Sequence, residues 1–185
     1  MGSKKNSPTF EIALSGISCA VAAGALALGL LSGYLVATGY LVGIVALMIP
    51  LSKQFFKGGF LAYVGTCILA VVLGAAVKFW DLVPFAMFFG LHPLLNALQI
   101  RFKINRWLAL TIKTVWFDCT LIAGYFLIYV VGGISLPAEI EAIINGWRLY
   151  VIIFTLGSAI FFVYDYLMFK IQIAVNSLVF RIIKK

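Results

Sequence analysis

Residues 10–31 read FEIALSGISCAVAAGALALGLL, an apolar run that decides the fold class of this protein. The hydrocarbon core of a bilayer is ~30 Å thick, and about 20 helical residues cross it. This run has that length, and its charged residue, Glu11, stands next to one end. Lys4 and Lys5 precede a run of full spanning length rather than a short signal-peptide core. We therefore expect residues 10–31 to form a membrane-spanning helix that is retained as an anchor.

Further apolar runs of spanning length follow the first. They occupy residues 33–51, 60–77, 82–100, 107–131 and 149–169. Of the 185 residues, 64% are hydrophobic and 11% are charged, whereas soluble domains carry ~25% charged residues. Because the connections are short, no soluble catalytic domain fits between the spans. The sequence predicts one all-α domain over residues 1–185, a polytopic integral membrane protein with six transmembrane helices.

The basic residues predict which side of the membrane each connection faces. Those on one side are Lys4, Lys5, Lys53, Lys57, Arg101, Lys103, Arg106, Arg181, Lys184 and Lys185, whereas Lys78 and Arg148 lie on the other. The side richer in basic residues faces the cytoplasm. We therefore expect both termini, with a tail over residues 170–185, to be cytoplasmic and the protein to lie in the cell membrane. These dispersed charges suit anionic lipid headgroups and exclude a nucleic-acid partner.

The connection between the last two spans predicts a short external helix over residues 137–145. Pro137 suits its first turn, Glu139 and Glu141 favour its amino end, and Gly146 suits its stop. It is either a lid or a fixed surface cap.

Small residues repeat at four-residue spacing on the first span. One strip comprises Gly16, Ala20 and Gly24, and the strip beside it comprises Cys19, Ala23 and Ala27. Lipid tails give no hydrophobic gain from helix association, so small residues that permit close backbone approach hold membrane helices together. These strips either join helices of this chain or dock a second protein, and two strips can serve both purposes.

Ionisable and amide residues inside the predicted spans form a candidate polar lock of the cytoplasmic half. A charge near a helix centre costs ~2.5 to 3.5 kcal/mol on insertion scales, so such residues usually face the bundle and pair. The members are His92, Asn96, Lys113, Asp118 and Asp165. We expect Lys113 to meet Asp165 or Glu11, and Asp118 to meet His92 or Asn96. The alternatives are a proton or substrate path, or a Lys113 that reaches the interface without a partner.

The sequence carries no motif for catalysis or for metal binding. Cys19, Cys67 and Cys119 lie in separate spans and form no CxxC pair. Zinc takes three or four His, Cys or carboxylate ligands, and a lone histidine does not supply them. We predict no catalytic residue, no metal, no cofactor and no enzymatic activity.

Six hydrophobic helices in so short a chain, with a first span striped by small residues, resemble the S component of energy-coupling factor (ECF) transporters. In that family a strip of AxxxA type meets the transmembrane coupling subunit, and a vitamin or similar micronutrient binds near the outer face. The resemblance implies that Ala23 and Ala27, beside Gly16, Ala20 and Gly24, dock a coupling subunit that works with ATPases. Residues 88–96, FFGLHPLLN, are also similar to a segment of other bacterial membrane proteins of this length.

Aromatic residues in the predicted outer half are candidates for substrate binding, although interfacial anchoring also accounts for most of them. They are Tyr34, Tyr40, Trp80, Tyr125, Tyr129 and Trp147. Two features depart from the family: the turn near residues 32–39 is short and uncharged, and the outer half lacks convergent polar groups. We expect the substrate-binding subunit of an ECF-type micronutrient transporter that captures a small, weakly polar molecule from outside. The alternative is a membrane scaffold or assembly protein that does not transport.

Overall fold

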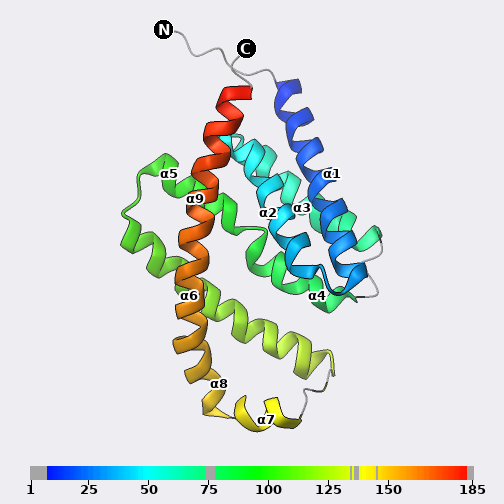
Figure 1. Cartoon of the computed structure of the whole chain (residues 1–185), viewed down its shortest axis with the longest axis vertical. Helices are drawn as coiled ribbons and strands as arrows, with labels where there is room; N and C mark the ends of the chain where they lie inside the picture. Colours follow the sequence, from blue (N-terminus) through cyan, green and yellow to red (C-terminus); the bar gives the residue numbers. More distant parts are fainter. Residues whose placement is uncertain (1–7, 74–77, 134, 136–137, 145, 183–185) are drawn as a thin grey trace.

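The computed structural model describes residues 8–73, 78–133, 135, 138–144 and 146–182. These residues form helices joined by short turns, and no strand occurs among them, which confirms the all-α prediction. Helix α1 begins and helix α9 ends at the same end of the molecule, at the top of Figure 1. Helix α7 lies at the opposite end.

The first part of the chain forms α1 (Pro8–Ser32), α2 (Val36–Ser52) and α3 (Phe56–Val72). Helices α1 and α2 cross closely because glycine faces glycine at their contact. A Cβ atom added to Gly39 would lie 2.7 Å from the carbonyl oxygen of Ala25 and 3.1 Å from the Cα of Gly29. The turn between them includes Gly33 at φ +71°, a left-handed conformation that glycine adopts without strain.

The middle of the chain is an interrupted helix. Helix α4 (Phe79–Pro84) passes into the π-helical segment η2 (Phe85–Phe89), and α5 (His92–Phe102) follows after Gly90 and Leu91. Pro84 and Pro93, which lack a backbone donor, mark both changes of geometry, and Pro93 lies in the first turn of α5. This irregular region carries the residues that build the candidate site.

The last part comprises α6 (Arg106–Tyr125) with η3 (Phe126–Val131), α7 (Ala138–Ile144), and α8 (Trp147–Ile152) with η4 (Ile153–Gly157) and α9 (Ser158–Ile182). Asn105 caps α6 by accepting a hydrogen bond from the backbone N–H of Trp107 at 2.9 Å. Helix α7 matches the predicted short helix, of which residues 137 and 145 lie outside the described part. In Figure 1, α6 crosses α9 at a steep angle.

Helix α9 extends into the predicted cytoplasmic tail, residues 170–185. The helix runs on past residue 169 to Ile182, and residues 183–185 of that tail lie outside the described part of the chain. The extension contains no glycine or proline that would stop a helix, and Gln172 Nε2 donates to Asn176 Oδ1 at 3.0 Å, one turn further on. The helix is therefore longer than the predicted span, and the cytoplasmic position of residues 170–185 stays a prediction.

Within the described part of the chain, four helices are long and apolar enough to cross a membrane: Pro8–Ser32, Phe79–Phe102, Arg106–Val131 and Trp147–Ile182. Helices α2 and α3 are also apolar but have 17 residues each. Many large apolar side chains are exposed on all of these helices, as expected of a surface that faces lipid. These features fit a membrane protein, and the count of six spans stays a prediction, with residues 74–77 outside the described part.

Candidate functional site

A cluster of polar side chains from α5, α6 and α9 lies inside the molecule. It contains His92, Asn96, Gln99, Lys113 and Asp165, and none of these residues is more than 6% exposed. Helix α5 supplies three of them because positions 92, 96 and 99 share one helical face. A buried polar group is costly unless it is hydrogen-bonded, so the contacts of each member decide what the cluster can do.

Lys113 is the centre of the cluster. Its Nζ atom donates hydrogen bonds to Asp165 Oδ1, to Asn96 Oδ1 at 3.0 Å and to Gln99 Oε1 at 3.1 Å. An ammonium group has three N–H donors, and all of them are used here. The charge of Lys113 is thus paired with one carboxylate and solvated by two amides.

His92 joins the cluster from the other side of Asp165. The Nδ2 amide of Asn96 donates to His92 Nδ1 at 3.4 Å, so His92 Nε2 carries the ring proton and donates it to Asp165 Oδ1 at 3.0 Å. Aromatic rings cover the imidazole: the Phe88 and Tyr164 ring centroids lie 5.4 Å and 5.0 Å from its own. The hydrogen bonds hold one tautomer, and the rings keep water away.

The structure joins four of the five predicted lock residues and separates the fifth. The predicted contact between Lys113 and Asp165 is present, and Lys113 does not reach the interface, since it is 3% exposed. The predicted contact of Asp118 with His92 or Asn96 is wrong, because Ser158 Oγ donates to Asp118 Oδ2 at 3.0 Å. Asp118 follows Lys113 by five residues, which turns it about 140° around α6 toward the start of α9.

A cavity of about 200 Å³ lies between η2 and the end of α6. Tyr125 and Tyr129, two of the predicted substrate-binding residues, line it. Sequence reasoning missed the other walls, which are Pro84, Met87, Phe88, Phe89, Phe117, Thr120, Leu121, Gly124 and Ile128. A Cβ atom added to Gly124 would meet nothing within 4 Å, so this glycine leaves room in the cavity. The spacing of Phe117, Thr120 and Gly124 on one helix face was the signal available in the sequence.

The other predicted substrate-binding residues do not converge on this cavity. Tyr34 is 99% exposed and Trp147 is 72% exposed, so both project from the surface. The hydroxyl of Tyr40 donates to the backbone carbonyl of Asp81, and the Trp80 ring packs against Phe79 with centroids 5.7 Å apart. Of the six predicted residues, the structure therefore brings Tyr125 and Tyr129 together at this cavity.

The two small-residue strips of α1 face in different directions. Ala23 and Ala27 are 0% and 5% exposed, because neighbouring helices cover them. In the same strip, the Sγ atom of Cys19 lies 2.9 Å from where a Cβ of Gly65 on α3 would stand. The prediction that Ala23 and Ala27 dock a coupling subunit is therefore wrong for this fold. The strip of Gly16, Ala20 and Gly24 is exposed or half-buried and remains accessible.

Among the residues described, no three or more His, Cys, Asp or Glu side chains gather as the ligands of a metal ion do. No protein-family model, no curated protein and no solved structure matches this chain.

Proposed function

We propose that this chain is a six-span protein of the cell membrane with cytoplasmic termini, and that it captures a small, weakly polar molecule from outside. In this proposal it acts as the substrate-binding subunit of an ECF-type uptake transporter. The observation that supports it best is the cavity beside Tyr125 and Tyr129, which lies next to a fully paired polar cluster. Phe88 separates the two: it lines the cavity and packs on His92.

The walls of the cavity define the chemistry of its ligand. They are mainly aromatic and aliphatic, and the hydroxyl of Thr120 already donates to the carbonyl of Trp116 at 2.6 Å. Sites for drug-sized ligands measure roughly 300–1,000 Å³, so a cavity of about 200 Å³ suits a smaller molecule. Tyr125 and Tyr129, with ring centroids 5.4 Å apart, offer flat apolar faces and phenol groups for a weakly polar or aromatic compound.

Two segments of π-helix support a binding role for this cavity. Phe88 and Phe89 belong to η2, and Ile128 and Tyr129 belong to η3. Such segments are rare and often occur at functional sites, because the wider turn redirects side chains from the regular helical positions.

Native mass spectrometry of the protein purified in mild detergent tests the proposal. Wild type should retain a small molecule, and Gly124→Leu, which fills the cavity, should lose it. Cys119→Leu is the matched control, since it places the same side chain on an exposed position of the same helix. A wild-type protein without bound mass, or Gly124→Leu with undiminished binding, would contradict the proposal.

The transport part of the proposal requires partners, because the sequence has no nucleotide-binding motif of its own. We propose that a coupling subunit docks on the accessible strip of Gly16, Ala20 and Gly24. Ala20→Leu should abolish copurification with that subunit and leave ligand retention unchanged.

The accessible strip also favours the second candidate function, a membrane scaffold. Crosslinking through this face would then recover one dominant protein partner, with no ligand and no solute uptake in vesicles. A ligand that raised the melting temperature of the isolated protein would count against this candidate, since ligands that bind the native state stabilise it.

A further inference from the structure

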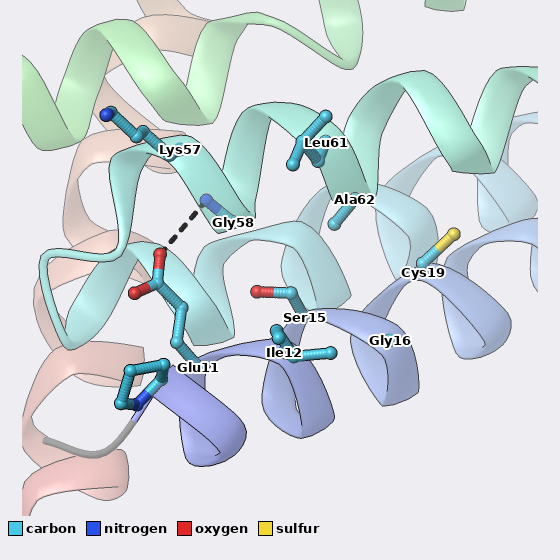
Figure 2. A pocket seen from close by; sticks show the side chains of 10 residues that line it. Glu11, Ile12, Ser15, Gly16, Cys19, Lys57, Gly58, Leu61 and Ala62 are labelled. Carbon is cyan, nitrogen blue, oxygen red and sulfur yellow. Dashed lines mark hydrogen bonds between the residues drawn. The ribbon is translucent and has the colours of Figure 1, made fainter.

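A second cavity, of about 350 Å³, opens between α1 and α3 at the end where both helices begin. Figure 2 shows Glu11 and Ser15 on the α1 side, and Lys57 and Gly58 on the α3 side. It shares no residue with the cavity beside Tyr125. Neither the polar cluster nor the proposed capture of a small molecule uses it, and Gly16 of the accessible strip is one of its lining residues.

Ser15 brings an unpartnered hydroxyl to the wall of this cavity. The residue is 7% exposed, and its Oγ atom is buried without a hydrogen-bond partner in the described chain. In Figure 2 the hydroxyl points into the space between the two helices. A Cβ atom on Gly58 would collide with this Oγ, so glycine at that position lets α3 approach the hydroxyl closely. Buried hydroxyl groups almost always have a partner, because leaving one unpaired costs about 1–3 kcal/mol.

Opposite charges on two walls of the cavity indicate the kind of ligand that fits. Glu11 Oε1 accepts a hydrogen bond from the backbone N–H of Gly58 at 3.3 Å, which holds the carboxylate at the cavity. The side chain of Lys57 extends away from Glu11 in Figure 2, and no ion pair joins the two among the described residues. A zwitterion whose two charges are a few atoms apart can meet both.

The remaining walls are apolar and face outward. Ile12 is 72% exposed and Leu61 is 67% exposed, so the cavity opens onto the surface that would face lipid. A molecule that reaches it along this surface carries hydrocarbon chains as well as a polar head.

We propose that the cavity between α1 and α3 binds the headgroup of a phospholipid that bears a primary ammonium group. The ammonium donates hydrogen bonds to Glu11 and to the hydroxyl of Ser15, the phosphate lies toward Lys57, and the acyl chains follow Ile12 and Leu61. A choline headgroup has the same charges but no N–H donor, and a glycerol headgroup has no cation to offer Glu11. The proposal depends on placement in a membrane and not on the capture of a substrate.

Lipid competition in nanodiscs tests this inference. The protein is reconstituted in equal amounts of phosphatidylethanolamine and phosphatidylcholine with identical chains, and the retained lipid is identified by native mass spectrometry. We expect about tenfold enrichment of phosphatidylethanolamine, the ratio that corresponds to ~1.4 kcal/mol. Glu11→Gln and Ser15→Ala should each reduce this enrichment severalfold. Ser15→Ala removes no hydrogen bond within the described chain and should fold as wild type.

Asp81→Asn is the charge-matched control for Glu11→Gln, because Asp81 is exposed and does not line the cavity. This variant should keep the wild-type preference, and gel filtration confirms that every variant is folded. Equal retention of the two lipids by wild type, or enrichment that persists in Glu11→Gln and Ser15→Ala, would overturn the proposal. Preferential retention of phosphatidylglycerol, or displacement of lipid by soluble phosphoethanolamine, would also overturn it.

Discussion

Lys113 on α6 and Asp165 on α9 form an ion pair that is closed off from solvent, and it ties together two helices that cross steeply. The amides of Asn96 and Gln99 extend the pair to α5. Removing one member of such a pair leaves the other charge buried without compensation. Charge compensation among these three helices therefore depends on a single carboxylate.

We predict that Asp165→Ala lowers the free energy of unfolding by about 3–5 kcal/mol, because Lys113 then lacks its counter-charge. Unfolding in detergent, followed by circular dichroism, measures the change. Adding Lys113→Met to this variant should recover part of the loss, since the unpaired charge is removed. If Asp165→Ala were as stable as wild type, the ion pair would not hold α6 and α9 together.

Substitution of Gly39 tests the crossing of α1 and α2. Gly39→Ala should destabilise the protein by roughly 1–3 kcal/mol, because its Cβ would press on the backbone of α1. Gly24→Ala is the matched control: its Cβ would meet nothing within 4 Å, and alanine favours the helix by up to ~1 kcal/mol. Melting temperatures should therefore move in opposite directions, and equal shifts would contradict this description of the contact.

Two adjacent phenylalanines of α9 should differ sharply in their effect on stability. Phe161 is fully buried and stacks on Phe117 with ring centroids 4.9 Å apart, whereas Phe162 is 48% exposed. Phe161→Ala should cost ~3–5 kcal/mol, and Phe162→Ala should change the free energy of unfolding by less than about 0.5 kcal/mol. Comparable losses for both variants would mean that α9 is rotated from the orientation described here.

Cysteine labelling in cells tests the proposed topology. With the native cysteines replaced by alanine, Glu139→Cys on α7 should react with a membrane-impermeant maleimide in intact cells. Lys103→Cys, between α5 and α6, should react only after lysis, because the basic connections are expected to be cytoplasmic. Both positions are exposed, so lack of access within the protein does not limit either reaction. The opposite labelling pattern would reverse the orientation.

Helix positions and the main ion pair were predictable from the sequence, whereas the direction of each helix face was not. Apolar runs locate the helices, and an interior with so few ionisable groups leaves Lys113 few partners. Which α1 strip is buried depends on how α1 turns toward α2 and α3, and both strips consist of small residues. The partner of Asp118 depends in the same way on the rotation of α6 against α9. Hydropathy marks the end of the apolar run near residue 169 and not the end of α9, because polar residues beyond that position continue the helix.

Phe88 gives the protein a built-in spectroscopic probe. One part of its ring lines the cavity beside Tyr125, and another lies against His92, the single histidine of the sequence. A molecule that enters the cavity and turns this ring changes the ring-current contribution to the chemical shifts of the imidazole protons. One histidine signal in an NMR spectrum, which needs no assignment, then reports whether the cavity is filled.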